Sequence, residues 1–102
     1  MFCYFFRIGA KRYKTEELLA NVEAFPNRFH RERGCLGYDI FCDLDRPDTF
    51  TMVAKWQNYQ DMQKHFQTLD FKILIGAAKV LGASSEVLIT ETVPLTPRSR
   101  GK

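Results

Sequence analysis

Two side chains in the middle of the chain, Trp56 and His65, have the chemistry to hold an aromatic ring and to deprotonate a hydroxyl group on it. An imidazole titrates near neutral pH, so a histidine beside an apolar surface can act as a general base. At helical spacing His65 lies next to Met62, Phe66 and Leu69, at the border of a buried stripe. An indole offers a flat apolar wall and one N–H donor. The same spacing is as typical of a histidine at the edge of a core and of a tryptophan packed at a strand end.

Four more residues are candidates to line a site for such a ring. Tyr4 and Tyr38 bring phenolic hydroxyls from separate predicted strands, and Met52 and Phe71 bring apolar surface. Each also has an ordinary structural interpretation, because the tyrosines suit a dimer interface and the other two suit a hydrophobic core. The prediction is therefore a pocket in which catalytic groups are surrounded by substrate-binding residues: Trp56, His65, Tyr4, Tyr38, Met52 and Phe71.

Motifs for metals and nucleotide cofactors do not occur in the sequence. His30 and His65 lie on different predicted helices, and no H-x-x-x-H pair is found. No glycine-rich phosphate loop follows a predicted strand. We therefore expect no metal site and no cofactor. Oxygen chemistry would then require an electron-rich substrate anion, such as a quinolate, that reduces O2 directly in a dry pocket supplied with a base and positioning groups.

The elements that must position these residues follow from the apolar pattern. Alternation over residues 50–56 predicts a strand that ends at Trp56. Asn58 and Thr68 are predicted to cap two successive helices, the first of which carries His65. Gly76 in the second helix costs about 1 kcal/mol relative to Ala, which indicates the close approach of a neighbour or a ligand.

The first third of the chain predicts a strand and an amphipathic helix. Residues 2–8 place bulky side chains on both faces of the strand, which is typical of a strand covered on both sides. Thr15 is predicted to cap the helix. Pro26 is expected to kink or divide the helix, with a bend that could shape a pocket entrance as the functional alternative. One stripe of this helix should face a sheet: Leu18, Val22, Phe25 and Phe29.

A turn and a hairpin follow. Gly34 is expected to end the helical region in the left-handed conformation. The second strand is predicted over residues 35–43, and residues 45–48 form the hairpin loop to the third strand. One side of the second strand should carry Leu36, Tyr38, Ile40 and Cys42.

The element order predicts the fold class. A β-α-β-β-α-β order with a divided second helical part is the ferredoxin-like arrangement, an α+β fold with an antiparallel sheet. One layer of helices covers one sheet face, so the apolar residues of the other face require a second copy of the chain, and a homodimer is predicted. Residues 1–93 form the predicted domain, and residues 94–102, with Arg98, Arg100 and Lys102, form a flexible basic tail.

Length and composition exclude several classes of protein. A chain of 102 residues is one domain, and a net charge of +3, much of it in the tail, does not indicate a nucleic-acid surface. No apolar run reaches membrane-spanning length. Cys3, Cys35 and Cys42 are odd in number and form no C-x-x-C pair, so the prediction is a reduced, cytoplasmic protein.

Two motifs resemble a known family. A strand that ends in Trp56, a capped turn, His65-Phe66 and the restart at residues 68–71 is similar to the antibiotic biosynthesis monooxygenase superfamily. Residues 34–38, Gly-Cys-Leu-Gly-Tyr, resemble the family's turn into its second strand, and the likeness spans roughly residues 2–93. It implies a dimeric α+β barrel. Through the quinol monooxygenases it implies cofactor-free oxidation of a quinol or polyphenol, in which Trp56 positions the ring and His65 assists deprotonation.

There are three alternatives to this activity. Haem-degrading members of the family place an Asn in the first strand and a ligand His in the last helix, where this chain has Phe6 and Ile75 or Gly76. RNA-binding domains of the same element order carry a base-stacking pattern that residues 50–56 lack. The stronger alternative is a dimer that binds a small aromatic or hydrophobic molecule in the same pocket without turnover.

Overall fold

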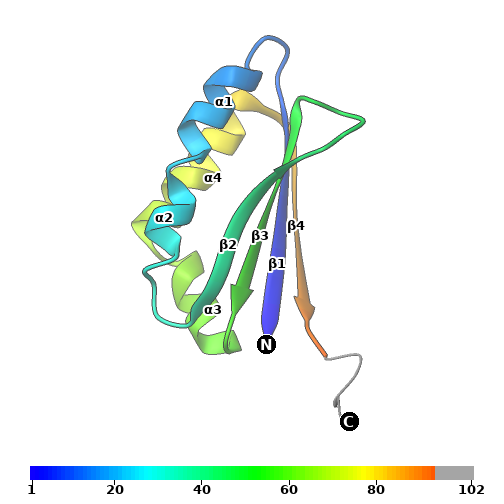
Figure 1. Ribbon diagram of the computed structural model, residues 1–102. Coiled ribbons are helices and arrows are strands. Elements are labelled where there is room, and N and C mark those ends of the chain that lie inside the picture. Colours follow the sequence, from blue (N-terminus) through cyan, green and yellow to red (C-terminus); the bar gives the residue numbers. More distant parts are fainter. Residues whose placement is uncertain (94–102) are drawn as a thin grey trace.

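A computed structural model describes residues 1–93 as an antiparallel sheet with helices packed on one of its faces (Figure 1). The elements are β1 (Phe2–Ala10), α1 (Thr15–Val22), α2 (Phe25–Phe29), β2 (Cys35–Cys42), β3 (Thr49–Trp56), α3 (Tyr59–Phe66), α4 (Leu69–Leu81) and β4 (Gly82–Glu91). The predicted tail, residues 94–102, lies outside the described residues.

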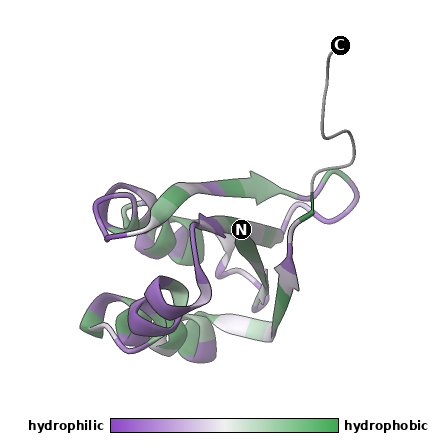
Figure 2. Ribbon diagram, turned by 90° about the horizontal axis from the view of Figure 1, so that it is seen from below, coloured by the Kyte–Doolittle hydropathy of each residue, from purple (hydrophilic) through white to green (hydrophobic). Residues whose placement is uncertain are grey.

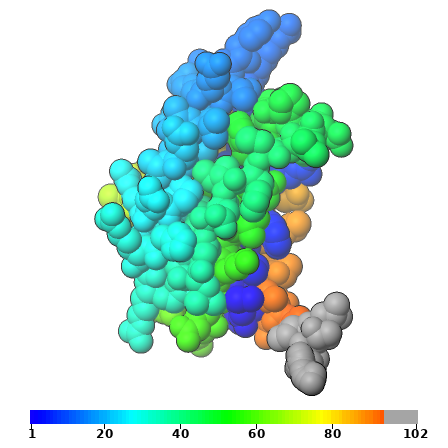
Figure 3. All heavy atoms as spheres, in the orientation of Figure 1, coloured from blue at the N-terminus to red at the C-terminus, as the bar shows by residue number. Residues whose placement is uncertain are grey.

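The sheet has the strand order β2-β3-β1-β4, and every neighbouring pair is antiparallel. In the middle of the sheet Tyr4 lies opposite Ala54 of β3 and opposite Ile89 of β4. The α+β, ferredoxin-like fold class is therefore confirmed. In Figure 3 the β1–α1 loop and the β2–β3 hairpin project at the same end of the molecule.

The core lies between the helices and the face of the sheet that they cover. Figure 2 shows that hydrophobic residues run along the strands, whereas the helices combine hydrophobic and hydrophilic residues. Burying one large apolar side chain contributes about 1.5–3 kcal/mol, so this layer dominates the stability of the chain. Its largest fully buried side chains are Trp56, Tyr4, Tyr38, Phe6 and Phe29.

Helix starts agree with the sequence at two of three positions. The side chain of Asn58 accepts a hydrogen bond from the backbone N–H of Asp61, and the Thr68 hydroxyl accepts one from the N–H of Phe71. The prediction for Thr15 was wrong, because it is the first residue of α1 and Lys14 occupies the cap position without a side-chain hydrogen bond. Two glutamates in the first turn favour the helix dipole there instead.

Pro26 divides the first helical region into α1 and α2. It stands in the first turn of α2, where a proline removes no intrahelical hydrogen bond. All four residues of the predicted stripe are buried: Leu18, Val22, Phe25 and Phe29. The division therefore keeps one continuous apolar side towards the sheet.

One other sequence prediction was wrong, and the part of a second that concerned a neighbour within the chain was wrong as well. The pairing of β2 with β3 shifts between Cys35 and Gly37, so Leu36 falls in a bulge and is 53% exposed instead of following Tyr38 into the core. Gly76 makes no close approach within the described chain, because a Cβ there would meet nothing within 4 Å. No helix within residues 1–93 is long and apolar enough to cross a membrane.

Candidate active site

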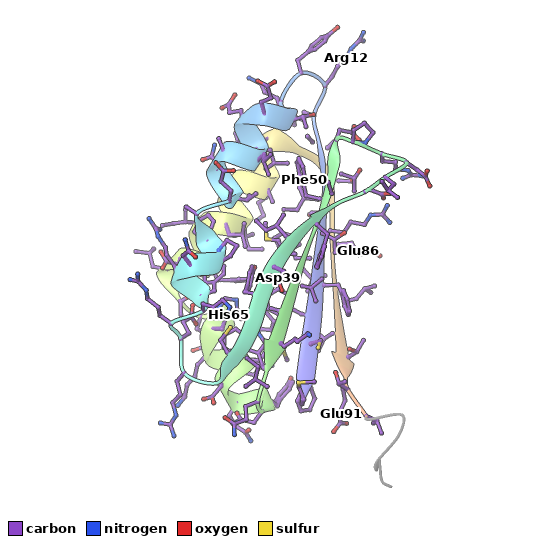
Figure 4. The ribbon with its side chains drawn as sticks, in the orientation of Figure 1. Arg12, Asp39, Phe50, His65, Glu86 and Glu91 are labelled. Carbon is purple, nitrogen blue, oxygen red and sulfur yellow. The ribbon has the colours of Figure 1, made fainter. Side chains whose placement is uncertain are left out.

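His65 lies at the centre of a buried aromatic cluster between the helices and the sheet (Figure 4). It stands in the last turn of α3, and the Thr68 hydroxyl donates to its backbone carbonyl at 2.8 Å. Its ring centroid is 4.4 Å from that of Phe29, 4.6 Å from that of Trp56 and 5.0 Å from that of Phe71. The structure thus brings all of the predicted site residues to one place, although they come from five elements, β1, β2, β3, α3 and α4.

Trp56 contributes a polar atom that lacks a partner. Its side chain is fully buried at the end of β3, and its Nε1–H has no hydrogen-bond acceptor among the described residues. An unpaired buried donor costs about 1–3 kcal/mol, so the fold retains this group at a disadvantage to stability. An acceptor oxygen on a bound molecule would remove the disadvantage.

A chain of hydrogen bonds connects His65 to the sheet. Its Nε2 is 2.6 Å from the hydroxyl of Tyr4, which donates to the hydroxyl of Tyr38 at 3.0 Å. Tyr38 donates in turn to the sulfur of Met52 at 3.4 Å. The two residues predicted from sequence as phenolic donors are thus partners of each other, and one of them, Tyr4, is also a partner of the predicted base.

Glu32 is a member of the site that the sequence analysis missed. Its carboxylate oxygens lie 3.0 and 3.1 Å from Nδ1 of His65. No periodic pattern marks it, because it lies in an irregular turn between α2 and β2 and the contact joins residues 33 positions apart in the chain.

The turn that carries Glu32 is fixed by Gly34. This glycine has a φ of 82°, the left-handed conformation that was predicted for it, although α2 already ends at Phe29. A Cβ at this position would overlap the carboxyl group of Asp61 in α3. The carbonyl of Gly34 also accepts from the N–H of Gln57 at 2.8 Å. The turn is therefore held against the same helix that carries His65.

Burial controls the electrostatics of this cluster. Desolvation lowers the pKa of His65 from 6.5 to about 4, so the ring is neutral at pH 7. Desolvation, with a smaller contribution from the charge of Asp70, raises the pKa of Glu32 from 4.5 to about 7. Burial also raises the pKa of both tyrosines, Tyr4 and Tyr38, above its ordinary value. Glu32 is therefore the one group of these four that titrates near pH 7, whereas His65 and the two tyrosines are neutral there.

The cluster is closed rather than open. His65, Tyr4, Trp56 and Met52 have 0% exposed surface, and the Glu32 side chain is 23% exposed. The open pocket expected from sequence at these residues is thus filled by their own side chains. A ligand reaches His65 only by displacing one of them.

The described residues offer no metal centre. No group of three or more His, Cys, Asp or Glu side chains within residues 1–93 is arranged to hold a metal ion. Cys3, Cys35 and Cys42 are free thiols. The His65 ring itself offers proton transfer and hydrogen bonding inside an apolar, buried space.

One known protein is similar to this chain in sequence, and several solved structures are similar to it in fold. The chain is 31% identical over 85 residues to the Bacillus subtilis (strain 168) protein named "Putative monooxygenase YcnE", covering 82% of this chain and 90% of that protein. Among solved structures, a Deinococcus radiodurans protein superposes with a TM-score of 0.87 at 21% identity, covering 98% of this chain and 100% of that one. Rv0793 from Mycobacterium tuberculosis superposes with a TM-score of 0.84 at 14% identity, covering 91% and 95%.

The structural likenesses establish the fold, and the sequence comparisons establish the family. The family model for antibiotic biosynthesis monooxygenases matches residues 1–75, a segment that contains β1 to α3 and every residue of the aromatic cluster around His65. This chain therefore belongs to the antibiotic biosynthesis monooxygenase family.

Proposed function

We propose that this protein is a cofactor-independent monooxygenase that oxidises a quinol or another polyphenolic ring with O2. The observation that carries the proposal is the short contact of 2.6 Å between Nε2 of His65 and a phenol, the side chain of Tyr4. A substrate phenol that replaces the Tyr4 hydroxyl would meet the same nitrogen. Family membership supports a monooxygenase reaction. The quinol or polyphenol as substrate is our own proposal.

His65 would act first, as the base. Its imidazole is held neutral by burial, so Nε2 is free to accept the proton of a substrate hydroxyl. The quinolate then reduces O2, and one oxygen atom is inserted into a C–H bond of the ring. The other oxygen atom leaves as water, with two of the protons that the hydroxyl groups and the broken C–H bond release. Quinol and O2 thus give hydroxyquinone and water, with the electrons of the quinol and of the broken C–H bond balancing the reduction of O2.

Trp56 would hold the oxygen that becomes negative. Its unpaired Nε1–H belongs to a ring 4.6 Å from that of His65, so one substrate can contact both groups. A donor kept in place before the reaction stabilises developing charge without reorganisation. Phe29 and Phe71 add apolar surface at the His65 ring and help to exclude water.

The active form in this proposal is a homodimer in the cytoplasm. The side of the sheet away from the helices, called the open face below, carries an apolar patch made of Phe5, Phe41, Val53 and Leu88. Phe41 is 55% exposed and Leu88 is 54% exposed, and a second copy would cover such a patch. The three free cysteines suit a reducing compartment.

Oxygen uptake tests the catalytic part of the proposal. Metal-stripped protein is assayed with reduced naphthoquinols, anthrols and catechols against the autoxidation of each compound. We expect saturable uptake that His65→Ala lowers by at least about 100-fold, since a general base contributes about 10²–10⁴-fold. Trp56→Phe, which keeps a ring and removes the N–H, should lower it by about 10–100-fold, the value of one hydrogen bond to a charged oxygen. The exposed His30, changed to Ala, is the matched control.

Uptake no faster than autoxidation across the panel would contradict the catalytic proposal. A second function is then favoured by the complete burial of His65, because turnover requires the cluster to open repeatedly and binding does not. That function is a dimer that binds a small aromatic molecule. The single tryptophan of the chain, Trp56, reports such binding by its fluorescence.

A further inference from the structure

The hydrogen-bond chain at His65 contains one hydrogen too few for its contacts. The Tyr4 hydroxyl has a single hydrogen and two acceptors in reach, Nε2 of His65 at 2.6 Å and the hydroxyl of Tyr38 at 3.0 Å. A neutral imidazole also carries one hydrogen and has a partner at each nitrogen, Tyr4 at Nε2 and Glu32 at Nδ1. The direction of every bond in the chain therefore depends on one proton.

Two arrangements of the hydrogens are compatible with this geometry, and only the second places a hydrogen in every contact, because the first leaves either Tyr4–Tyr38 or Tyr38–Met52 without one. In the first, Glu32 is ionised and accepts from Nδ1–H, so Nε2 is bare and accepts from Tyr4. In the second, Glu32 is protonated and donates to Nδ1, so Nε2 carries the hydrogen and donates to Tyr4. Tyr4 then donates to Tyr38, and Tyr38 donates to Met52. Only the first arrangement leaves Nε2 able to accept a proton from a phenol.

We propose that Glu32 is a positioning residue that decides which nitrogen of His65 carries the hydrogen, and that its carboxyl group is the route by which protons pass between solvent and the buried phenols. The inference rests on the proposed function only for the role of Nε2 as a base. The tautomer itself is a property of the free protein.

The position of Glu32 suits this role. Its side chain is 23% exposed, whereas the His65 side chain beyond it has 0% exposed surface, so among these groups the carboxyl is the one that contacts water. The backbone that carries this carboxyl is also held in place, because the carbonyl of Glu32 accepts from the N–H of Cys35 at 3.1 Å and its N–H donates to the carbonyl of Phe29 at 3.0 Å. A fixed carboxylate at one ring nitrogen is the usual device that sets the state of the other.

The charged and titratable groups around Glu32 favour a proton uptake near neutral pH. Asp70 on α4 repels its negative charge, although Arg28 on α2 pairs with Asp70 at 3.2 Å. The thiol of Cys35 on β2 and the phenols of Tyr4 and Tyr38 face the same space, and burial raises the pKa of each. His65 on α3, whose ring is neutral at pH 7, is the hydrogen-bond partner of the Glu32 carboxyl group. Burial and Asp70 together bring the pKa of Glu32 to about 7.

The tautomer is measured by two-dimensional ¹H–¹⁵N spectroscopy of the imidazole rings from about pH 5 to about pH 9. The chain has two histidines, so His30→Gln assigns the signals of His65. In the wild type we expect the ¹⁵N shifts of Nδ1 and Nε2 to exchange their protonated and bare values across this range. In Glu32→Gln, which keeps the shape and cannot ionise, we expect one tautomer throughout. Glu32→Asp should restore the change, and Glu23→Gln, which alters an exposed glutamate directly after α1, should leave it as in the wild type.

A wild-type ring that keeps one tautomer, a ring that becomes doubly protonated in this range, or a Glu32→Gln variant that still switches would overturn the inference. None of these results depends on turnover. If oxygen uptake is found, its rate should fall about tenfold per pH unit below the pKa of Glu32 in the wild type and stay level in Glu32→Gln. A protein that switches tautomer and consumes no oxygen would retain the inference and lose only the catalytic proposal.

Discussion

The two faces of the sheet differ in how far their apolar side chains are buried. On the face that the helices cover, Tyr4, Phe6 and Ile8 of β1 are buried, and the hydroxyl of Tyr4 finds partners inside the chain. On the open face, Phe5 of the same strand lies beside Val53 and Leu88, and Leu88 is 54% exposed. Because successive side chains of a strand point to opposite faces, β1 contributes to a closed core on one side and to a partly exposed apolar surface on the other.

The two faces also differ in whether water reaches their polar groups. The open face carries its charges at the edges of the apolar patch, as in the Arg7 and Asp43 pair at 2.8 Å, where water screens them. Glu86 in Figure 4 also points away from the helices. On the covered face polar groups are few, and the Nε1–H of Trp56 lacks a partner in the described chain. Our proposals therefore assign chemistry to the covered face and dimerisation to the open one.

The largest predicted difference between the faces is in folding stability. Phe6→Ala removes a side chain that is 1% exposed, and we expect a loss of about 3–5 kcal/mol in the free energy of unfolding. Phe41→Ala, on the open face at 55% exposure, should cost less than about 1 kcal/mol at low protein concentration. Chemical denaturation measures both. Equal losses at low concentration would show that the open face is already covered within the monomer.

A charge on the open face should separate the predicted dimer. Leu88→Glu would place a carboxylate within the apolar patch, on the edge strand β4 opposite Phe5, so we expect the dissociation constant of the dimer to rise at least about tenfold, or about 1.4 kcal/mol. Sedimentation equilibrium of the variant and the wild type measures this constant. Leu44→Glu, at a side chain in the hairpin loop that is 99% exposed, is the control. A wild type that is monomeric at every concentration would contradict the dimer.

The smallest predicted effect is the alkaline pH dependence of the covered face. Because burial raises the pKa of Tyr4 and Tyr38 above the usual value of 10.0, the unfolded chain loses these protons first. Their contribution is complete below pH 10 and is lost as the pH rises, by about 1.4 kcal/mol per pH unit for each phenol. Tyr4→Phe should reduce that slope by about half.

Unfolding free energies measured from neutral pH to above pH 10 give the slope. Tyr13→Phe is the matched control, since the side chain of Tyr13 is 87% exposed in the β1–α1 loop, and it should keep the wild-type slope. An unchanged slope in Tyr4→Phe would mean that this phenol ionises in the folded chain as it does in the unfolded one.

The site was predictable where its residues lie in regular elements. His65 follows from the stripe of α3, and Trp56 follows from the alternation of β3. Glu32 was not predictable, because its turn is irregular and its contact with His65 is made by the packing of α2 against α3. The bulge at Leu36 was missed for a related reason, since one extra residue resets the alternation without a signal in residue type.

The sequence alone determined the element order, the helix starts at Asn58 and Thr68, the division at Pro26 and the family, because these depend on local hydrogen bonds and on short periods along the chain. Tertiary structure alone decided that Tyr4, Tyr38 and Glu32 meet at one imidazole, and that this imidazole is sealed from water. Such contacts join residues from separate elements. Their geometry, and the shifts of pKa that burial causes, exist only after the sheet and helices have packed.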